Sequence, residues 1–159
     1  MPLAQALAEF QTAVTQCDSL ITNAHKTDAS GAALFPVIDR EQITSAAFLN
    51  MFIAWEEFLE KSILNLMTGQ PTIKGNLPVK YVSPKTVEDA HNMLKGTSRH
   101  FDYANHSNVR MMARLYFDQG IPYESPLASI DQDLQDLKTI RVHPKSFCGL
   151  AKPSDHQAD

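Results

Sequence analysis

Large apolar residues recur at helical spacing in five stretches of the chain, which are separated by segments rich in glycine, proline and small polar residues. In the first stretch, residues 3–24, they lie three or four positions apart. This spacing places them on one face of an amphipathic helix. The positions are Leu3, Leu7, Phe10, Val14, Cys17 and Ile21.

The longest apolar stripe runs from about residue 40 to 68 and predicts the core helix of the fold. Asp39 is expected to be its N-cap, because a carboxylate can accept hydrogen bonds from the free amides of a first turn. Gly69 and Pro71 are expected to end it. The stripe is broad enough to contact more than one neighbouring helix, and it consists of Ile43, Ala47, Phe48, Phe52, Trp55, Leu59, Ile63 and Leu66.

Three shorter helices are predicted after an irregular connection, residues 69–84, in which Tyr81 is expected to pack. They cover residues 85–95, residues 109–119 with Ser107 or Asn108 as the cap, and a last helix entered at Asp131. The prediction is therefore an all-α fold, an antiparallel helical bundle of four to five helices. Residues 1–150 are expected to form a single domain, and residues 151–159 a polar, disordered tail.

Composition narrows the classes of function. A net charge of −4 argues against a protein that coats nucleic acid by charge alone, although a local basic cleft is compatible with it. No apolar run is long enough to span a membrane and no secretion signal is seen, so a cytoplasmic protein without a membrane partner is expected. Cys17 and Cys148 are expected to be reduced thiols. His100 and His106 lack the spacing of a zinc pair, so no metal and no cofactor is predicted.

The candidate chemistry lies at the end of the last helix. Leu134, Leu137 and Ile140 predict a buried face that leads to Arg141, and His143 follows two residues later. A guanidinium can hold a phosphate through two hydrogen bonds, and an imidazole can transfer a proton near neutral pH. Arg141 and His143 are therefore the candidate catalytic residues for phosphodiester cleavage that needs no metal.

The sequence around these residues, LKTIR followed by VHPKS, resembles the end of a HEPN domain, a helical superfamily of RNA-cleaving toxins and defence proteins. The similarity extends over roughly residues 40 to 150 and includes the WEEFLE phrase at 55–60, the helix start at Asn108 and Val109, and the GIP turn at 120–122. It implies a metal-independent endoribonuclease of a toxin-antitoxin or antiviral system. It also implies an RNA substrate, a homodimer whose two Arg/His sets line one cleft, and a cognate antitoxin protein.

Further residues are candidates for supporting roles. Glu56, in the WEEFLE phrase, is the candidate to orient Arg141 across the bundle through a charged hydrogen bond. Arg110 and Arg114 share a helix face and, with Lys145, are the predicted RNA-binding cations. A second candidate site for nucleic-acid binding is the group Arg99, His100, Tyr103 and His106.

The motif departs from the family pattern in two respects. HEPN proteins separate the Arg and the His by four to six residues, whereas only Val142 separates them here, and no helical pattern follows His143. Two alternatives to an active ribonuclease therefore stay open. One is a non-catalytic HEPN-like module that binds RNA or an antitoxin. The other is a helical oligomer without an RNA role, in which Arg141 caps the last helix through its carbonyls.

Overall fold

The computed structural model of the chain describes residues 2–142, except for the side chains of residues 138 and 140–142. Within residues 2–142 the only extended pairings are two isolated bridges, and the regular elements are six α-helices and one 3₁₀ helix, so the all-α prediction is confirmed. The elements are α1 (Leu3–Ala24), α2 (Val37–Met67), α3 (Val87–Lys95), α4 (His106–Tyr116), η1 (Asp118–Gly120), α5 (Glu124–Ser129) and α6 (Asp131–Val142). None of these helices is both long enough and apolar enough to cross a membrane.

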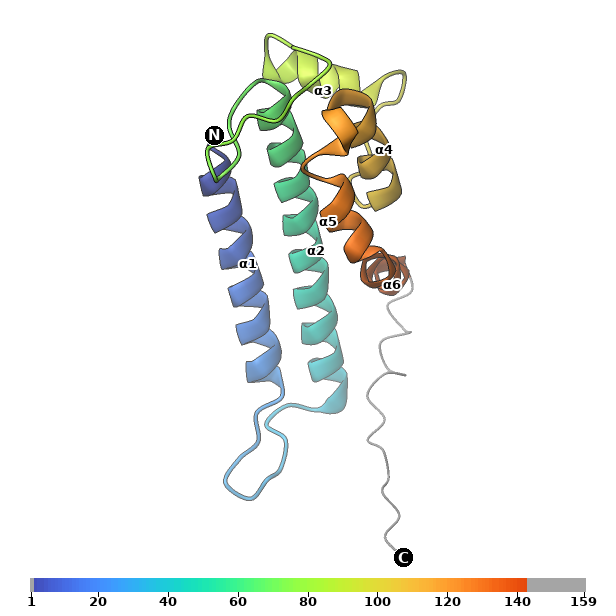
Figure 1. The fold of residues 1–159 in the computed structure, drawn as a ribbon. Helices are drawn as coiled ribbons and strands as arrows, with labels where there is room; N and C mark the ends of the chain where they lie inside the picture. The colour runs from blue at the N-terminus through green and yellow to red at the C-terminus, as the bar shows by residue number, and fades with distance from the viewer. Residues whose placement is uncertain (1, 143–159) are drawn as a thin grey trace, which may run out of the picture.

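The helices α1 and α2 form a long antiparallel hairpin (Figure 1). The ring of Phe10 lies 5.8 Å from that of Trp55 and 5.5 Å from that of Phe58, measured between centroids. These aromatic contacts exclude water along the hairpin and hold its two helices together. The bounds of α1 are those that its apolar spacing predicts.

The start of α2 differs from the prediction. The helix begins at Val37, directly after Pro36, whose φ of −56° fixes the entry into the first turn. Asp39 is consequently not the N-cap but a residue of the first turn, where its negative charge favours the positive end of the helix dipole. The apolar spacing identifies the helix correctly, but the capping residue was misassigned because proline also initiates helices.

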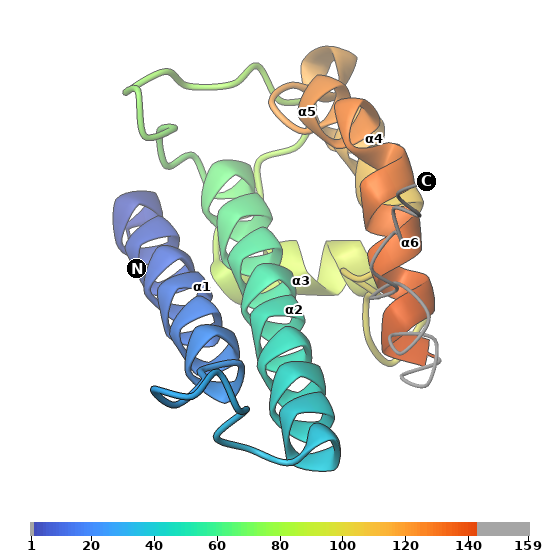
Figure 2. The ribbon, with the colours of Figure 1, turned by 90° about the horizontal axis from the view of Figure 1, so that it is seen from below.

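The short helix α3 lies across the end of the hairpin (Figures 1 and 2). It starts at Val87 rather than Lys85, because Thr86 and Asp89 form a reciprocal capping box. The side chain of Thr86 accepts from the Asp89 amide at 3.0 Å, and the Asp89 carboxylate accepts from the Thr86 amide at 3.1 Å. This pair satisfies two amides that the helix itself leaves free.

The helix α4 is displaced by three residues from its predicted position. It starts at His106, with Asn105 as the cap, and ends at Tyr116. It cannot continue to Gln119, because the backbone of Phe117 is extended and pairs with Lys80 in the connection that follows α2. The segment after Gly120, expected to be only a turn, contains the short helix α5.

The core is centred on the end of α2 and on the residues that follow α4. Phe117 is completely buried, and its ring centroid lies 6.0 Å from that of the buried Tyr123. The hydroxyl of Tyr123 lies 2.6 Å from that of Ser62 on α2, so the one buried polar pair here is mutually satisfied. Tyr81, by contrast, is 61% exposed and does not pack the connection as expected.

Candidate functional site

The helix that carries Arg141, α6, packs on the core through its predicted apolar face. Leu134 is buried in the main core cluster, and Leu137 packs both on that cluster and on a second one that contains Phe48 and Phe52. Position 141 follows Leu137 by four residues, so it lies one turn further along the same face of α6. The side chain of Arg141, and the whole of His143 and Lys145, lie outside the described residues.

Glu56 lies on α2 between two residues of the core clusters. It is four residues after Phe52 and three before Leu59, both of which are buried, and it is itself half-buried. The neighbouring acids have other partners, since Glu57 lies 3.6 Å from Lys61 and Glu60 lies 3.2 Å from His91. The structure therefore places the candidate supporting carboxylate on the core-facing side of α2, while its role toward Arg141 stays a prediction.

A network of charged side chains fixes the start of α6. Arg110 on α4 donates from Nη2 and Nε to Oε1 of Glu124, at 2.7 and 3.2 Å. Its Nη1 donates to Oδ1 of Asp131, the first residue of α6, at 2.9 Å. One guanidinium thus joins α4, α5 and α6, and the hydrogen bonds from Arg110 hold the pKa of Glu124 below its usual value.

The buried side chain of His106 also contacts this network. Its side chain is 5% exposed, and Nε2 lies 3.1 Å from Oδ1 of Asp131. Tyr103 is also buried, whereas Arg99 and His100 are exposed. The prediction that these four residues form one nucleic-acid binding site is therefore wrong, because Tyr103 and His106 are buried in the interior of the fold.

Arg110 and Arg114 lie on one face of α4, as predicted, but their environments differ. The guanidinium of Arg110 is already engaged by two carboxylates, whereas the Arg114 side chain is 57% exposed, with Nε 3.4 Å from Oε2 of Glu124. The apolar spacing does not identify Glu124 and Asp131 as partners. Their position at the starts of two consecutive helices, where acids are favoured, is the signal that could have identified them.

We expect Arg110→Ala to lower the melting temperature more than Arg114→Ala does. The first substitution removes the guanidinium that contacts both Glu124 and Asp131, and the second removes only an exposed ion pair. Thermal denaturation followed by circular dichroism at neutral pH measures both. Equal decreases would show that the network does not hold α4, α5 and α6 together.

Among residues 2–142, no group of three or more His, Cys, Asp or Glu side chains could hold a metal ion. Cys17 is buried, and this burial raises the pKa of its thiol. Comparisons of the chain with models of known protein families, with characterised proteins and with solved structures give no match.

Proposed function

We propose that the chain is a HEPN-type, metal-independent endoribonuclease that acts on cytoplasmic RNA as the toxin of a toxin-antitoxin or antiviral system. The observation that carries the proposal is the packing of Leu137, on α6, against the cluster that contains Phe48 and Phe52 of α2. Glu56 follows Phe52 by four residues and is half-buried, and Arg141 follows Leu137 by four residues. This is the pairing of two sequence segments on which the HEPN resemblance rests.

In this proposal Arg141 and His143 have different roles in RNA cleavage. His143 removes the proton from a ribose 2′-hydroxyl, which attacks the adjacent phosphorus, or returns a proton to the departing 5′-oxygen. Arg141 neutralises the additional negative charge of the pentacovalent phosphate. The P–O5′ bond breaks, leaving a 2′,3′-cyclic phosphate and a 5′-hydroxyl. A homodimer would bring two such sets to one cleft, and an antitoxin would restrain them.

The test compares three proteins on labelled total RNA in the presence of EDTA. They are the chain itself, a version in which residues inserted after Arg141 restore the family spacing to His143, and that version with Arg141→Ala. Metal-independent cleavage by the first and second proteins, lost in the third, is the expected result. Cleavage by none of them, or cleavage that survives Arg141→Ala, would contradict the proposal.

The second candidate function is a non-catalytic HEPN-like module that binds RNA or an antitoxin protein. The specific observation in its favour is that Val142 alone separates Arg141 from His143, because side chains two positions apart on a helix point to different sides. The same experiment separates the two candidates. Cleavage by the restored version alone would indicate a ribonuclease fold whose site is disabled in this chain.

A further inference from the structure

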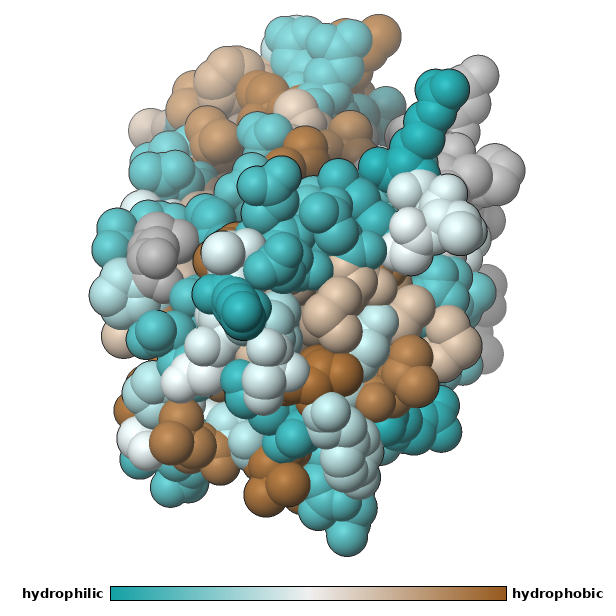
Figure 3. All heavy atoms as spheres, turned by 90° about the horizontal axis from the view of Figure 1, so that it is seen from above, coloured by the Kyte–Doolittle hydropathy of each residue, from teal (hydrophilic) through white to brown (hydrophobic). Residues whose placement is uncertain are grey.

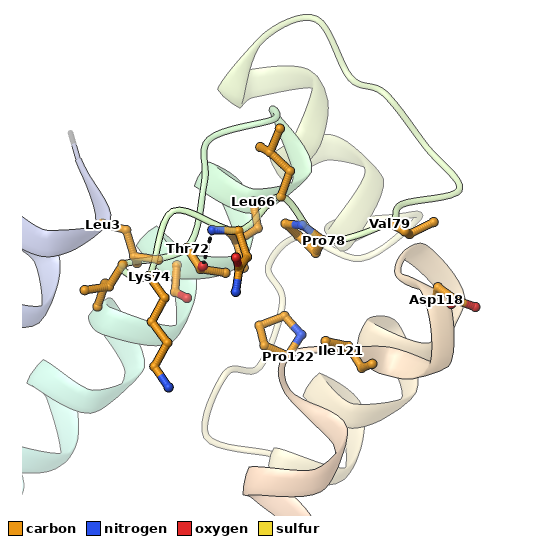
Figure 4. A pocket seen from close by; sticks show the side chains of 13 residues that line it. Leu3, Leu66, Thr72, Lys74, Pro78, Val79, Asp118, Ile121 and Pro122 are labelled. Carbon is orange, nitrogen blue, oxygen red and sulfur yellow. Dashed lines mark hydrogen bonds between the residues drawn. The ribbon is translucent and has the colours of Figure 1, made fainter.

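A hollow of about 550 Å³ opens at the end of the hairpin where α2 ends (Figure 4). It lies between the connection 69–86 and the turn that follows α4, and its walls are mainly apolar. Buried Leu3 and Leu66 line it together with Pro78 and Pro122. A cavity of this size is within the range of sites that receive another molecule, about 300–1,000 Å³.

Four large apolar side chains around this hollow are exposed to solvent. Ile73, Leu77 and Val79 of the connection are 53%, 66% and 66% exposed, and Ile121 of the facing turn is 54% exposed. Seen from above, this end of the molecule carries patches of apolar side chains among polar ones (Figure 3). Single exposed apolar residues are ordinary, but a group that surrounds one concave apolar site is typical of a docking surface.

The connection beside the hollow carries charge of one sign. The connection 69–86 contains three lysines and no acidic residue, in a chain whose net charge is −4. Lys80 is engaged, because its Nζ donates to the carbonyl oxygen of Met67 at 2.6 Å. Lys74, which lines the hollow, and Lys85 are exposed, and within residues 2–142 no ion pair is formed by either.

One carboxylate, that of Asp118, lies beside the hollow, and it is held elsewhere. Its Oδ1 accepts a hydrogen bond of 2.7 Å from the hydroxyl of Tyr81. Figure 4 shows its side chain directed away from the hollow. The charge that a molecule entering the hollow meets is therefore that of Lys74.

We propose that this surface docks an acidic segment of a partner protein, which inserts large apolar side chains into the hollow and presents carboxylates to Lys74. The positive charge selects an acidic partner. The concave shape favours discrete side chains over a lipid surface, because the apolar walls can be covered only by groups that enter. The inference does not depend on the proposed RNA cleavage, since it uses no residue of that site.

The test is a selection from a library of random 16-residue peptides displayed on phage, with the full chain as the target and its Leu77→Glu variant for counter-selection. Synthetic copies of the enriched peptides are then measured by fluorescence anisotropy. We expect them to carry a net negative charge and at least two large apolar residues. Leu77→Glu is expected to weaken their binding about tenfold or more, because a carboxylate would replace an apolar contact in the centre of the interface.

Two further variants make the result specific. Ile38→Glu is the matched control, because Ile38 is similarly exposed, at 63%, but lies at the opposite end of α2, and it should leave binding unchanged. Lys74→Glu should weaken binding and reduce its dependence on salt. Circular dichroism is used to check that every variant is folded. Folding should be retained because Leu77 and Lys74 are both exposed.

Several outcomes would overturn the inference. They are the absence of peptides that distinguish the chain from Leu77→Glu, enrichment of peptides without net negative charge, and weakening by Ile38→Glu as large as that by Leu77→Glu. Sedimentation with phosphatidylserine vesicles is measured in parallel. Binding to vesicles that requires Leu77, without a peptide that competes for it, would assign the surface to a membrane instead.

Discussion

Replacement of Phe117 by alanine is expected to lower the free energy of unfolding by about 3–5 kcal/mol, the usual cost of deleting a buried aromatic ring. Phe117 is completely buried and packs beside Tyr123. Its neighbours in the chain are also tied to the connection after α2, because the Tyr81 amide donates to Tyr116 and the Asp118 amide donates to Val79. These backbone bonds limit how far the site can collapse into the space left by the ring.

Phe35→Ala is the control for this substitution, since it deletes the same group at a position that is 39% exposed. Its effect should be within about 1 kcal/mol, because surface substitutions away from special features change stability little. Urea denaturation followed by circular dichroism gives the free energy of unfolding of both variants. The comparison holds when the dependence of this free energy on urea concentration equals that of the parent chain. A loss of less than about 1 kcal/mol for Phe117→Ala would contradict the packing described for the end of α4.

The second large effect concerns activity. In whichever version of the chain cleaves RNA in EDTA, His143→Ala is expected to reduce the rate by about 10²- to 10⁴-fold, the usual contribution of one general acid or base. The other proposed element, Arg141, is retained in this variant, so RNA should still bind. The loss should therefore appear in kcat more than in KM.

His100→Ala is the matched control, because His100 is an exposed histidine on the connection before α4 and has no proposed part in cleavage. The measurement is the single-turnover rate on a labelled oligoribonucleotide, with identification of the cyclic phosphate end. A His143→Ala variant that cleaves as fast as its parent, or a His100→Ala variant that loses as much, would contradict the assignment. Both variants should keep the helicity of the parent.

The apolar spacing alone determined most of the secondary structure. It identified α1 to the residue and located the four other main helices, because a buried face leaves a repeat of three or four positions in any sequence. It also identified Leu134 as a residue of the buried face of α6. The helix ends were predicted less well, since Pro36, Thr86 and Asn105 each compete locally with a neighbouring residue that could also begin a helix.

The tertiary structure decided what the polar residues do. Repeat spacing gives no information on contacts across the bundle, so it could not predict that Arg110 joins Glu124 and Asp131, or that His106 is buried beside Asp131. It likewise could not predict the hollow between residues 72–79 and 121–122, because long-range folding alone brings those two segments together. The sequence thus determined which faces are apolar, whereas packing determined which charges are paired and which apolar residues are left exposed around one site.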